Sequence, residues 1–259
     1  MLHHQIVGTG KPVLILHGVT LDHRYMMEVL EPAFVNTPGF KRFYLDFPGH
    51  GQSPAQEDIR SQDDLLNVVM GFIKAHMPDE PFALIGLSRG SYIARGIVHQ
   101  MPDRVSGAAL IVPGGNPSSR HVLPDHEILV PDPTMRAELA PNELWAHENL
   151  SVVQNRDILK QRRRVVAPAQ ELFDAEQDAR IKEAFDFSFK ESEESQVFNR
   201  PSLIVAGRQD SISGYLDSID LMQRYTRATL AVLDTAGHGL AIERPEVFHA
   251  LIGDWLARL

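Results

Sequence analysis

The 259-residue sequence predicts an α/β protein in which helices cover both faces of a mostly parallel sheet. Six short runs are almost continuously apolar, as strands buried on both faces are. Gly-rich breaks follow several of these runs, and patterns with helical periodicity lie between them. The predicted buried strands are residues 13–16, 42–45, 82–85, 108–112, 203–206 and 230–233.

The other elements of this fold have recognisable start signals. Residues 2–7, followed by a Gly-rich turn, predict one antiparallel strand at an edge of the sheet. Ser61 followed by Asp64 resembles a capping box at the start of an amphipathic helix. Pro245 opens the last helix, because its missing N–H would have no partner in the first turn anyway.

The alternation stops between residues 113 and 200, where no convincing buried strand occurs. A Pro- and Gly-rich break at 113–117 opens this segment, and helices are predicted over 142–150 and from Pro168 to about Lys190. A structureless loop of that length inside a compact domain would be unusual. We therefore expect a helical cap at residues 113–200, inserted into a core domain made of residues 1–112 and 201–259.

Composition excludes several classes of function. Hydrophobic residues make up 43% and charged residues 23%, as in ordinary globular proteins, and no apolar stretch is long enough to span a bilayer. The formal charge of −9 disfavours broad contact with nucleic acid or anionic lipid. The absence of cysteine excludes disulfides and a thiol nucleophile. With no secretory signal, we expect a cytoplasmic protein with a small-molecule substrate and no nucleic-acid or membrane partner, and leave a homodimer open.

Residues that follow the predicted strands should meet at one edge, because the carboxyl ends of parallel strands line the ligand crevice. Residues 82–85 are followed by a G-x-S-x-G pattern at 86–90, between a strand and a helix. Both glycines remove a Cβ from a tight turn, so the side chain of Ser88 should project. A serine nucleophile needs a base and a group that orients the base. His238 and Asp210 each follow a later strand and are the predicted base and acid, with the nearby Asp217, Asp220 and Asp234 as alternatives for the acid.

The order Ser88, Asp210, His238 and the turns around these residues resemble the α/β-hydrolase superfamily over nearly the full chain. The resemblance implies an α/β-hydrolase fold with a lid in the insertion, and an oxyanion hole made by the backbone N–H groups of Val19 and Arg89. The matching turns are the His-Gly turn at 16–19, the D-x-P-G-x-G-x-S turn at 46–53, the serine turn at 86–90, the acid turn at 207–210 and the histidine turn at 237–239.

The resemblance also implies a function, namely a cofactor-free, carboxylesterase-like serine hydrolase. It would cleave a small ester, lactone or related acyl bond through a Ser-His-Asp triad and an acyl-enzyme. Alternatives within the superfamily are a C–C bond hydrolase of ring-cleavage products and a cofactor-free haloperoxidase or acyltransferase. A small-molecule receptor with a capped pocket is the alternative from another class. The serine at position 88 argues against dehalogenases and epoxide hydrolases, which use an aspartate nucleophile there.

Arg89 departs from the family pattern, in which an uncharged residue usually stands beside the nucleophile. Together with Arg120 and Arg136 of the insertion, it could hold a substrate carboxylate through bidentate hydrogen bonds. An ion pair with a glutamate of the insertion is the alternative, and the sequence leaves both open.

Other polar and aromatic residues are interpreted as structural. Asp46 lies among turn-forming glycines, and His17 lies in a backbone turn. The basic run at 162–164 is expected on a solvated helix face. His121 and His126 lack metal-ligand spacing and are expected at the surface, so no metal site is predicted. The core of the cap is expected to contain Trp145, Phe185, Phe187 and Phe189, with pocket lining as the alternative.

Overall fold

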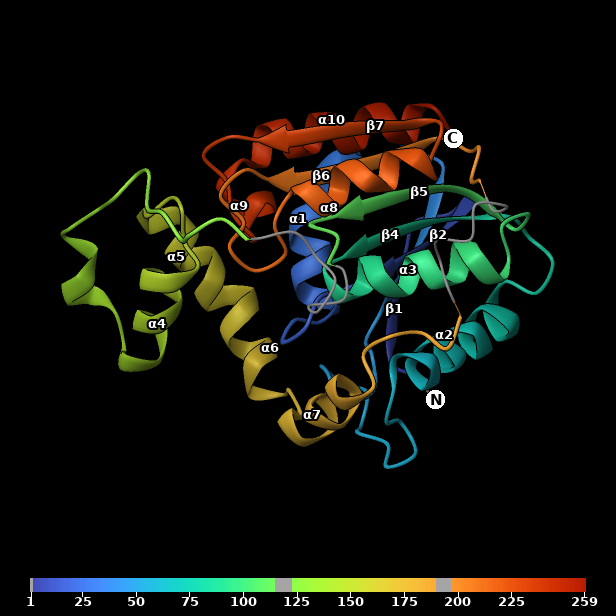
Figure 1. Cartoon of the computed structure of the whole chain (residues 1–259), viewed down its shortest axis with the longest axis horizontal. Helices are drawn as coiled ribbons and strands as arrows, with labels where there is room; N and C mark the ends of the chain where they lie inside the picture. The colour runs from blue at the N-terminus through green and yellow to red at the C-terminus, as the bar shows by residue number, and fades with distance from the viewer. Residues whose placement is uncertain (1, 115–122, 190–196) are drawn as a thin grey trace.

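The computed structural model describes residues 2–114, 123–189 and 197–259. Seven strands of this part of the chain form one sheet in the order β1-β3-β2-β4-β5-β6-β7 (Figure 1). β1 is antiparallel to β3, and all other neighbours are parallel. The mostly parallel sheet and its antiparallel edge strand are therefore confirmed. The strands are β1 (His4–Val7), β2 (Lys11–Leu16), β3 (Phe40–Leu45), β4 (Phe82–Leu87), β5 (Val105–Ile111), β6 (Ser202–Gly207) and β7 (Ala228–Leu233).

Burial along the strands explains their apolar sequences, with one exception. Every residue of β4 and β6 is buried, because helices cover both faces of the central sheet. The prediction that residues 230–233 are buried on both faces was wrong. β7 is the last strand of the sheet, each of its six residues is half-buried or exposed, and Val232 is 36% exposed. An edge strand is paired on one side only, so its outer residues reach solvent.

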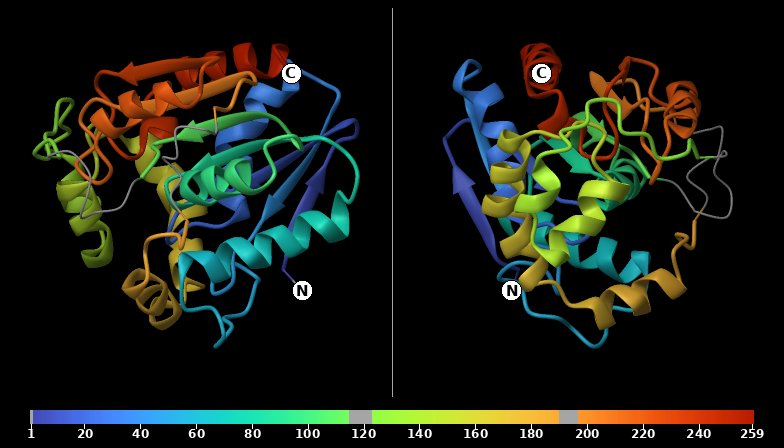
Figure 2. Two further views of the ribbon diagram at one scale, coloured as in Figure 1. Left: turned by 45° about the vertical axis from the view of Figure 1, so that its right-hand side comes forward. Right: turned by 90° about the vertical axis from the view of Figure 1, so that its left-hand side faces the viewer.

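Two layers of helices enclose the sheet (Figures 1 and 2). α1 and α10 pack against one face in a single apolar cluster, and α2 and α3 pack against the other. The Ser61 hydroxyl accepts the Asp64 N–H at 3.1 Å, which confirms the predicted helix start. The helices of this part are α1 (His23–Val35), α2 (Gln62–His76), α3 (Arg89–Gln100), α8 (Leu216–Asp220), the 3₁₀ turn η3 (Leu221–Gln223), α9 (Leu240–Glu243) and α10 (Pro245–Ala257).

Between β5 and β6 the chain forms further helices that lie beyond the carboxyl ends of the strands, at the arrowheads in Figure 1. We call residues 113–200 the inserted segment. The predicted break at 113–117 lies largely outside the described residues. The elements of the segment are η1 (Met135–Glu138), α4 (Pro141–Asn149), α5 (Arg156–Gln161), the π-helical η2 (Arg162–Val166), α6 (Ala167–Glu171) and α7 (Ala175–Glu183).

The helix predicted over 142–150 is confirmed as α4, whereas the single helix from Pro168 to Lys190 was wrong. The helical run instead begins with α5 and passes through η2, immediately before Pro168, whose missing N–H interrupts the regular hydrogen-bond ladder. It ends before Asp174, whose side chain accepts the Gln177 N–H and starts α7. Lys190 lies outside the described residues.

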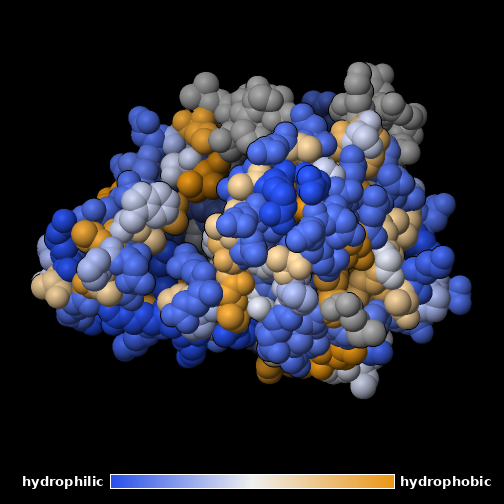
Figure 3. Space-filling view, turned by 90° about the horizontal axis from the view of Figure 1, so that it is seen from below, coloured by the Kyte–Doolittle hydropathy of each residue, from blue (hydrophilic) through white to orange (hydrophobic). Residues whose placement is uncertain are grey.

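None of the described helices is both long and apolar enough to cross a membrane. Figure 3 shows one face of the molecule, on which hydrophilic residues predominate and hydrophobic residues form small, separate patches. The parallel strands end beside the inserted segment, at the carboxyl edge of the sheet, where sheets of this kind bind their ligands.

Candidate active site

Ser88 occupies a strained turn between β4 and α3. Its φ is +53°, a region that L-residues rarely adopt and that costs about 1–3 kcal/mol. Two glycines allow the turn to close. A Cβ on Gly86 would lie 2.3 Å from the carbonyl oxygen of Gly90, and a Cβ on Gly90 would lie 2.2 Å from that of Leu16. Both contacts involve backbone atoms, so the turn that presents Ser88 requires glycine at both positions.

Gly90→Ala is expected to lower the free energy of unfolding by about 3 kcal/mol, because the backbone must shift to admit the new methyl group. Gly71→Ala is the matched control, since Gly71 lies in α2 and a Cβ there would meet nothing within 4 Å. The control should gain up to about 1 kcal/mol from helix propensity. Urea denaturation followed by circular dichroism measures both, and equal stabilities would contradict the close approach at Gly90.

The structure brings the three predicted catalytic residues into one hydrogen-bonded chain. His238 Nε2 lies 3.1 Å from Ser88 Oγ, and His238 Nδ1 lies 2.9 Å from Asp210 Oδ2. A carboxylate only accepts, so Nδ1 carries the proton and Nε2 is left to accept the serine proton. Asp210 is itself held in place, because its Oδ1 accepts the backbone N–H groups of Ile212 and Ser213, each at 2.9 Å.

The surroundings of His238 favour its protonated form. Burial lowers the pKa of His238, but the charge of Asp210, the hydrogen bond to it and the charge of Glu243 outweigh this. The pKa of His238 is therefore raised above its ordinary value of 6.5. An imidazolium that forms during proton transfer is stabilised by the same interactions.

The loop after β2 lies directly against Ser88. A Cβ on Gly18 would come within 3.2 Å of Ser88 Cβ, which places the neighbouring Val19 beside the serine turn. Arg89 is the first residue of α3, so its N–H has no acceptor within the helix. Both backbone groups predicted as oxyanion donors therefore belong to turns that adjoin Ser88.

The Arg89 side chain forms a buried ion pair with the inserted segment. It lies 2.5 Å from Asp178 of α7, and the two side chains are only 3% and 6% exposed. Lys182 contacts the same carboxylate at 2.8 Å. Arg136 pairs with Glu148 at the surface. For Arg89 and Arg136 the structure thus favours the ion-pair alternative, with an aspartate as the partner of Arg89. Arg120 lies outside the described residues.

His17 has the structural role that the sequence suggested. Its Nδ1–H donates to the Gly18 carbonyl at 2.7 Å, and its Nε2 accepts the Phe47 N–H at 3.0 Å. Burial, helped by the charge of His50, lowers the pKa of His17 to about 3. The neutral ring therefore links the loop after β2 to the loop after β3.

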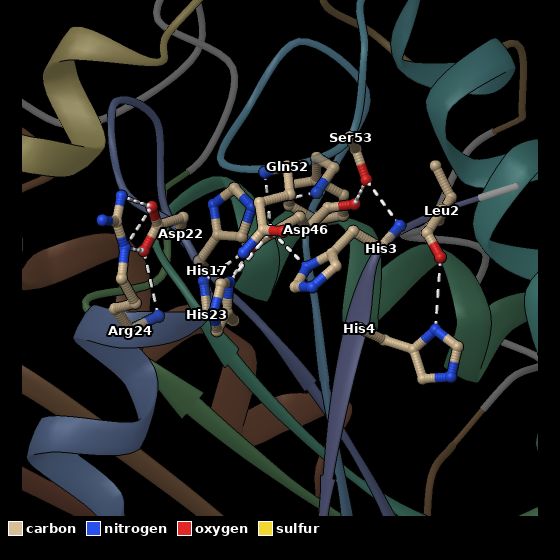
Figure 4. Close-up of polar contacts among 11 residues, drawn as sticks. Leu2, His3, His4, His17, Asp22, His23, Arg24, Asp46, Gln52 and Ser53 are labelled. Carbon is tan, nitrogen blue, oxygen red and sulfur yellow. Dashed lines mark hydrogen bonds and ion pairs between the residues drawn. The ribbon is translucent and has the colours of Figure 1, made fainter.

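Asp46 is the centre of a hydrogen-bond network at the end of β3 (Figure 4). Its carboxylate accepts from His3 Nδ1 at 2.8 Å, from the N–H and Nδ1 of His23 at 2.8 and 2.9 Å, and from the Gln52 N–H at 3.0 Å. Burial alone would raise the pKa of Asp46, but the donors from His23 and Gln52 hold it well below its usual range. The network confirms that Asp46 stabilises its turn.

His3, His23 and Asp46 form the group of potential metal ligands that the described part of the chain contains, with ligand atoms within 4.8 Å of one another. No ligand spacing in the sequence indicates this group, because His3 and His23 are far from Asp46 in the chain. Both histidines hydrogen-bond directly to the Asp46 carboxylate, which satisfies the carboxylate without a cation. His126 is half-buried and outside this group, and His121 lies outside the described residues.

The aromatic residues and the basic run of the inserted segment differ in their burial. Phe187 stacks on Tyr92 of α3 in the core, whereas Trp145 is 62% exposed, so Trp145 does not belong to a core. Phe185 and Phe189 pack partly buried against the same cluster as Phe187. Arg163 and Arg164 lie on an exposed face as expected, but Arg162 is partly buried.

Comparisons with known proteins agree with this fold. A family profile described as alpha/beta hydrolase fold matches residues 11–245. Protein ABHD14A of Danio rerio is 24% identical over 57% of this chain, which spans only 54% of that protein. Monoacylglycerol lipase ABHD6 of Rattus norvegicus is 24% identical to this chain over 96% of this chain and 76% of the length of the lipase. An alpha/beta superfamily hydrolase from Oenococcus oeni PSU-1 superposes with a TM-score of 0.90 at 24% identity, over 99% of this chain and 96% of that one.

Proposed function

Because the chain belongs to the α/β-hydrolase family, we propose that it is a cofactor-free serine hydrolase that cleaves a small ester, lactone or related acyl bond. The observation that carries this proposal is the chain of hydrogen bonds from Ser88 through His238 to Asp210. The three groups supply a nucleophile, a general base that becomes a general acid, and the carboxylate that orients it.

In the first half of the proposed reaction, His238 Nε2 takes the hydroxyl proton while Ser88 Oγ attacks the substrate carbonyl carbon. The N–H groups of Val19 and Arg89 would stabilise the negative oxygen of the tetrahedral intermediate, and one such donor is typically worth about 3–4 kcal/mol. The imidazolium then gives its proton to the leaving alcohol, and the acyl group remains on Ser88.

In the second half, water replaces the alcohol. His238 removes a proton from the water, the resulting hydroxide attacks the acyl carbon, and the proton passes to Ser88 Oγ as the acid leaves. Asp210 keeps the proton on Nδ1 throughout, so that Nε2 faces the reacting atoms in both halves.

We further propose that the inserted segment acts as a cap that limits the size of the substrate. Its helices lie at the carboxyl edge of the sheet, and Asp178 of α7 reaches the side chain next to Ser88. Because Asp178 already neutralises Arg89, that arginine is not left as a free cation for a substrate carboxylate, which favours an uncharged acyl group. The name of the Rattus norvegicus relative, a lipase of monoacylglycerol, agrees with an ester substrate.

The proposal is tested with a fluorophosphonate probe and a series of p-nitrophenyl esters. We expect the probe to label Ser88, located by peptide mass spectrometry, and we expect turnover of the acetate and butyrate esters to fall steeply for longer chains. Absence of both labelling and turnover would exclude the hydrolase and leave the receptor alternative. Efficient turnover of long chains would instead contradict a small, capped pocket.

A further inference from the structure

Glu243, at the end of α9, is a buried carboxylate outside the proposed triad. It is 8% exposed, and it accepts backbone N–H groups from two distant parts of the chain. Its Oε2 accepts from Gly237 at 2.7 Å, and its Oε1 accepts from Val152 at 2.7 Å and from Val153 at 3.4 Å. One side chain thus joins the residue before His238 to the inserted segment.

The two parts that Glu243 joins are also in direct contact. A Cβ on Gly237 would lie 2.8 Å from Val152 Cγ2, so glycine is needed for the two segments to approach. Apolar residues of α5 and η2 belong to the same buried cluster as residues of α9. The contacts around the carboxylate are therefore closely packed, and displacement of the inserted segment would strain the histidine turn.

The charge of Glu243 is compensated within this contact. Arg162 of η2, Tyr25 of α1 and His238 all lie near enough to interact with its charge. The pKa of Glu243 is raised above its ordinary value, because the effect of burial outweighs the opposing effects of the three N–H donors and the charge of Arg162. Burial of a carboxylate without such partners costs free energy. The hydrogen bonds that Glu243 accepts therefore stabilise it in this position.

We propose that Glu243 is a positioning residue that fastens the His238 turn to the inserted segment, so that this segment fixes the alignment of the imidazole with Ser88. The inference rests on the proposed function, because it assigns to Glu243 a task in that same site. A purely structural residue would change stability alone, whereas Glu243 should also change how His238 titrates and how fast the reaction proceeds.

Glu243→Gln tests this role with little change of shape. The NH2 group of the glutamine would face one of the three backbone N–H groups, so that hydrogen bond would be lost. The negative charge near His238 would be lost as well. We expect kcat to fall about 10–100-fold with KM changed less than about twofold. The acid limb of kcat/KM should move to lower pH, because a nearby negative charge that raises the pKa of His238 is lost. Glu243→Asp, which keeps the charge, should restore the position of that limb.

Glu246→Gln is the matched control, because Glu246 is an exposed carboxylate in the first turn of α10. It removes one negative charge from the same region, and kcat and the pH profile should stay as in the wild type. If Glu243→Gln also kept wild-type kcat and the same acid limb, the positioning role would be overturned.

Amide hydrogen exchange provides a readout that does not depend on activity. In Glu243→Gln, exchange should accelerate together in residues 236–240 and 150–154, and Arg162→Met should accelerate it in residues 236–240 from the other side of the contact. Acceleration confined to one of the two segments in Glu243→Gln would overturn the proposal. If the wild-type protein showed neither labelling at Ser88 nor turnover of the esters, the hydrolase proposal would fail, and the exchange result would still decide whether Glu243 fastens the turn.

Discussion

Replacing Ser88 with alanine is expected to lower kcat on short p-nitrophenyl esters by about 10⁶-fold and to abolish fluorophosphonate labelling. Without Oγ no acyl-enzyme can form, and only the proposed oxyanion donors and substrate binding remain to assist direct attack by water. The variant should stay folded, because Ser88 Oγ contributes a single hydrogen bond, to a partly exposed histidine. Single-turnover assays, with the enzyme in large excess over the ester, would measure the residual rate of hydrolysis.

Ser91→Ala is the matched control for this substitution. Ser91 lies one turn further along α3, and its buried hydroxyl lies 2.6 Å from the Gly86 carbonyl oxygen, the nearer of two acceptors for its single proton. The same hydroxyl accepts the Ile111 N–H at 3.1 Å. Its loss should cost about 1 kcal/mol of stability while labelling of Ser88 continues. If Ser88→Ala retained more than about 1% of the activity, another nucleophile would have to be sought.

The predicted parts of the site are those that the chain encodes locally. The turn around Ser88 depends on glycines two residues to either side, and their close contacts with backbone atoms explain why this short pattern could be recognised. Asp210 and His238 could be placed because each follows a predicted parallel strand, β6 or β7, and parallel strands bring their carboxyl ends together. Gly207 explains the closeness of these two turns, since a Cβ there would lie 2.4 Å from the Gly237 carbonyl.

The parts that sequence reasoning missed depend on contacts between residues far apart in the chain. Arg89 pairs with Asp178, Glu243 with the backbone at Val152, and Asp46 with His3, and no spacing in the sequence relates these partners. The single helix predicted from Pro168 to Lys190 was wrong for another reason. Apolar periodicity continues across Asp174, although its side chain starts a new helix there.

Asp210→Asn is expected to lower kcat by about 10⁴-fold while KM changes little. The asparagine amide can donate to His238 Nδ1, which places the imidazole proton on Nε2, where it can no longer accept from Ser88. The acid limb of kcat/KM should also move to lower pH. Asp210 supplies a charge and a hydrogen bond that raise the pKa of His238, and without them burial lowers it. Measuring kcat/KM from pH 5 to 9 tests both effects in one series.

Asp234→Asn tests whether Asp234, and not Asp210, is the orienting acid. Asp234 also follows a strand and lies near His238 in the sequence. Asp234 is exposed at the end of β7 and accepts hydrogen bonds from Gln209 and Thr235 rather than from the histidine. We expect this variant to keep wild-type kcat and the wild-type acid limb. Near-normal activity in Asp210→Asn together with a large loss in Asp234→Asn would show that the orienting acid is Asp234. If only Asp210→Asn lost activity, the result would support the 2.9 Å hydrogen bond from His238 to Asp210 as the contact that sets the tautomer of the histidine.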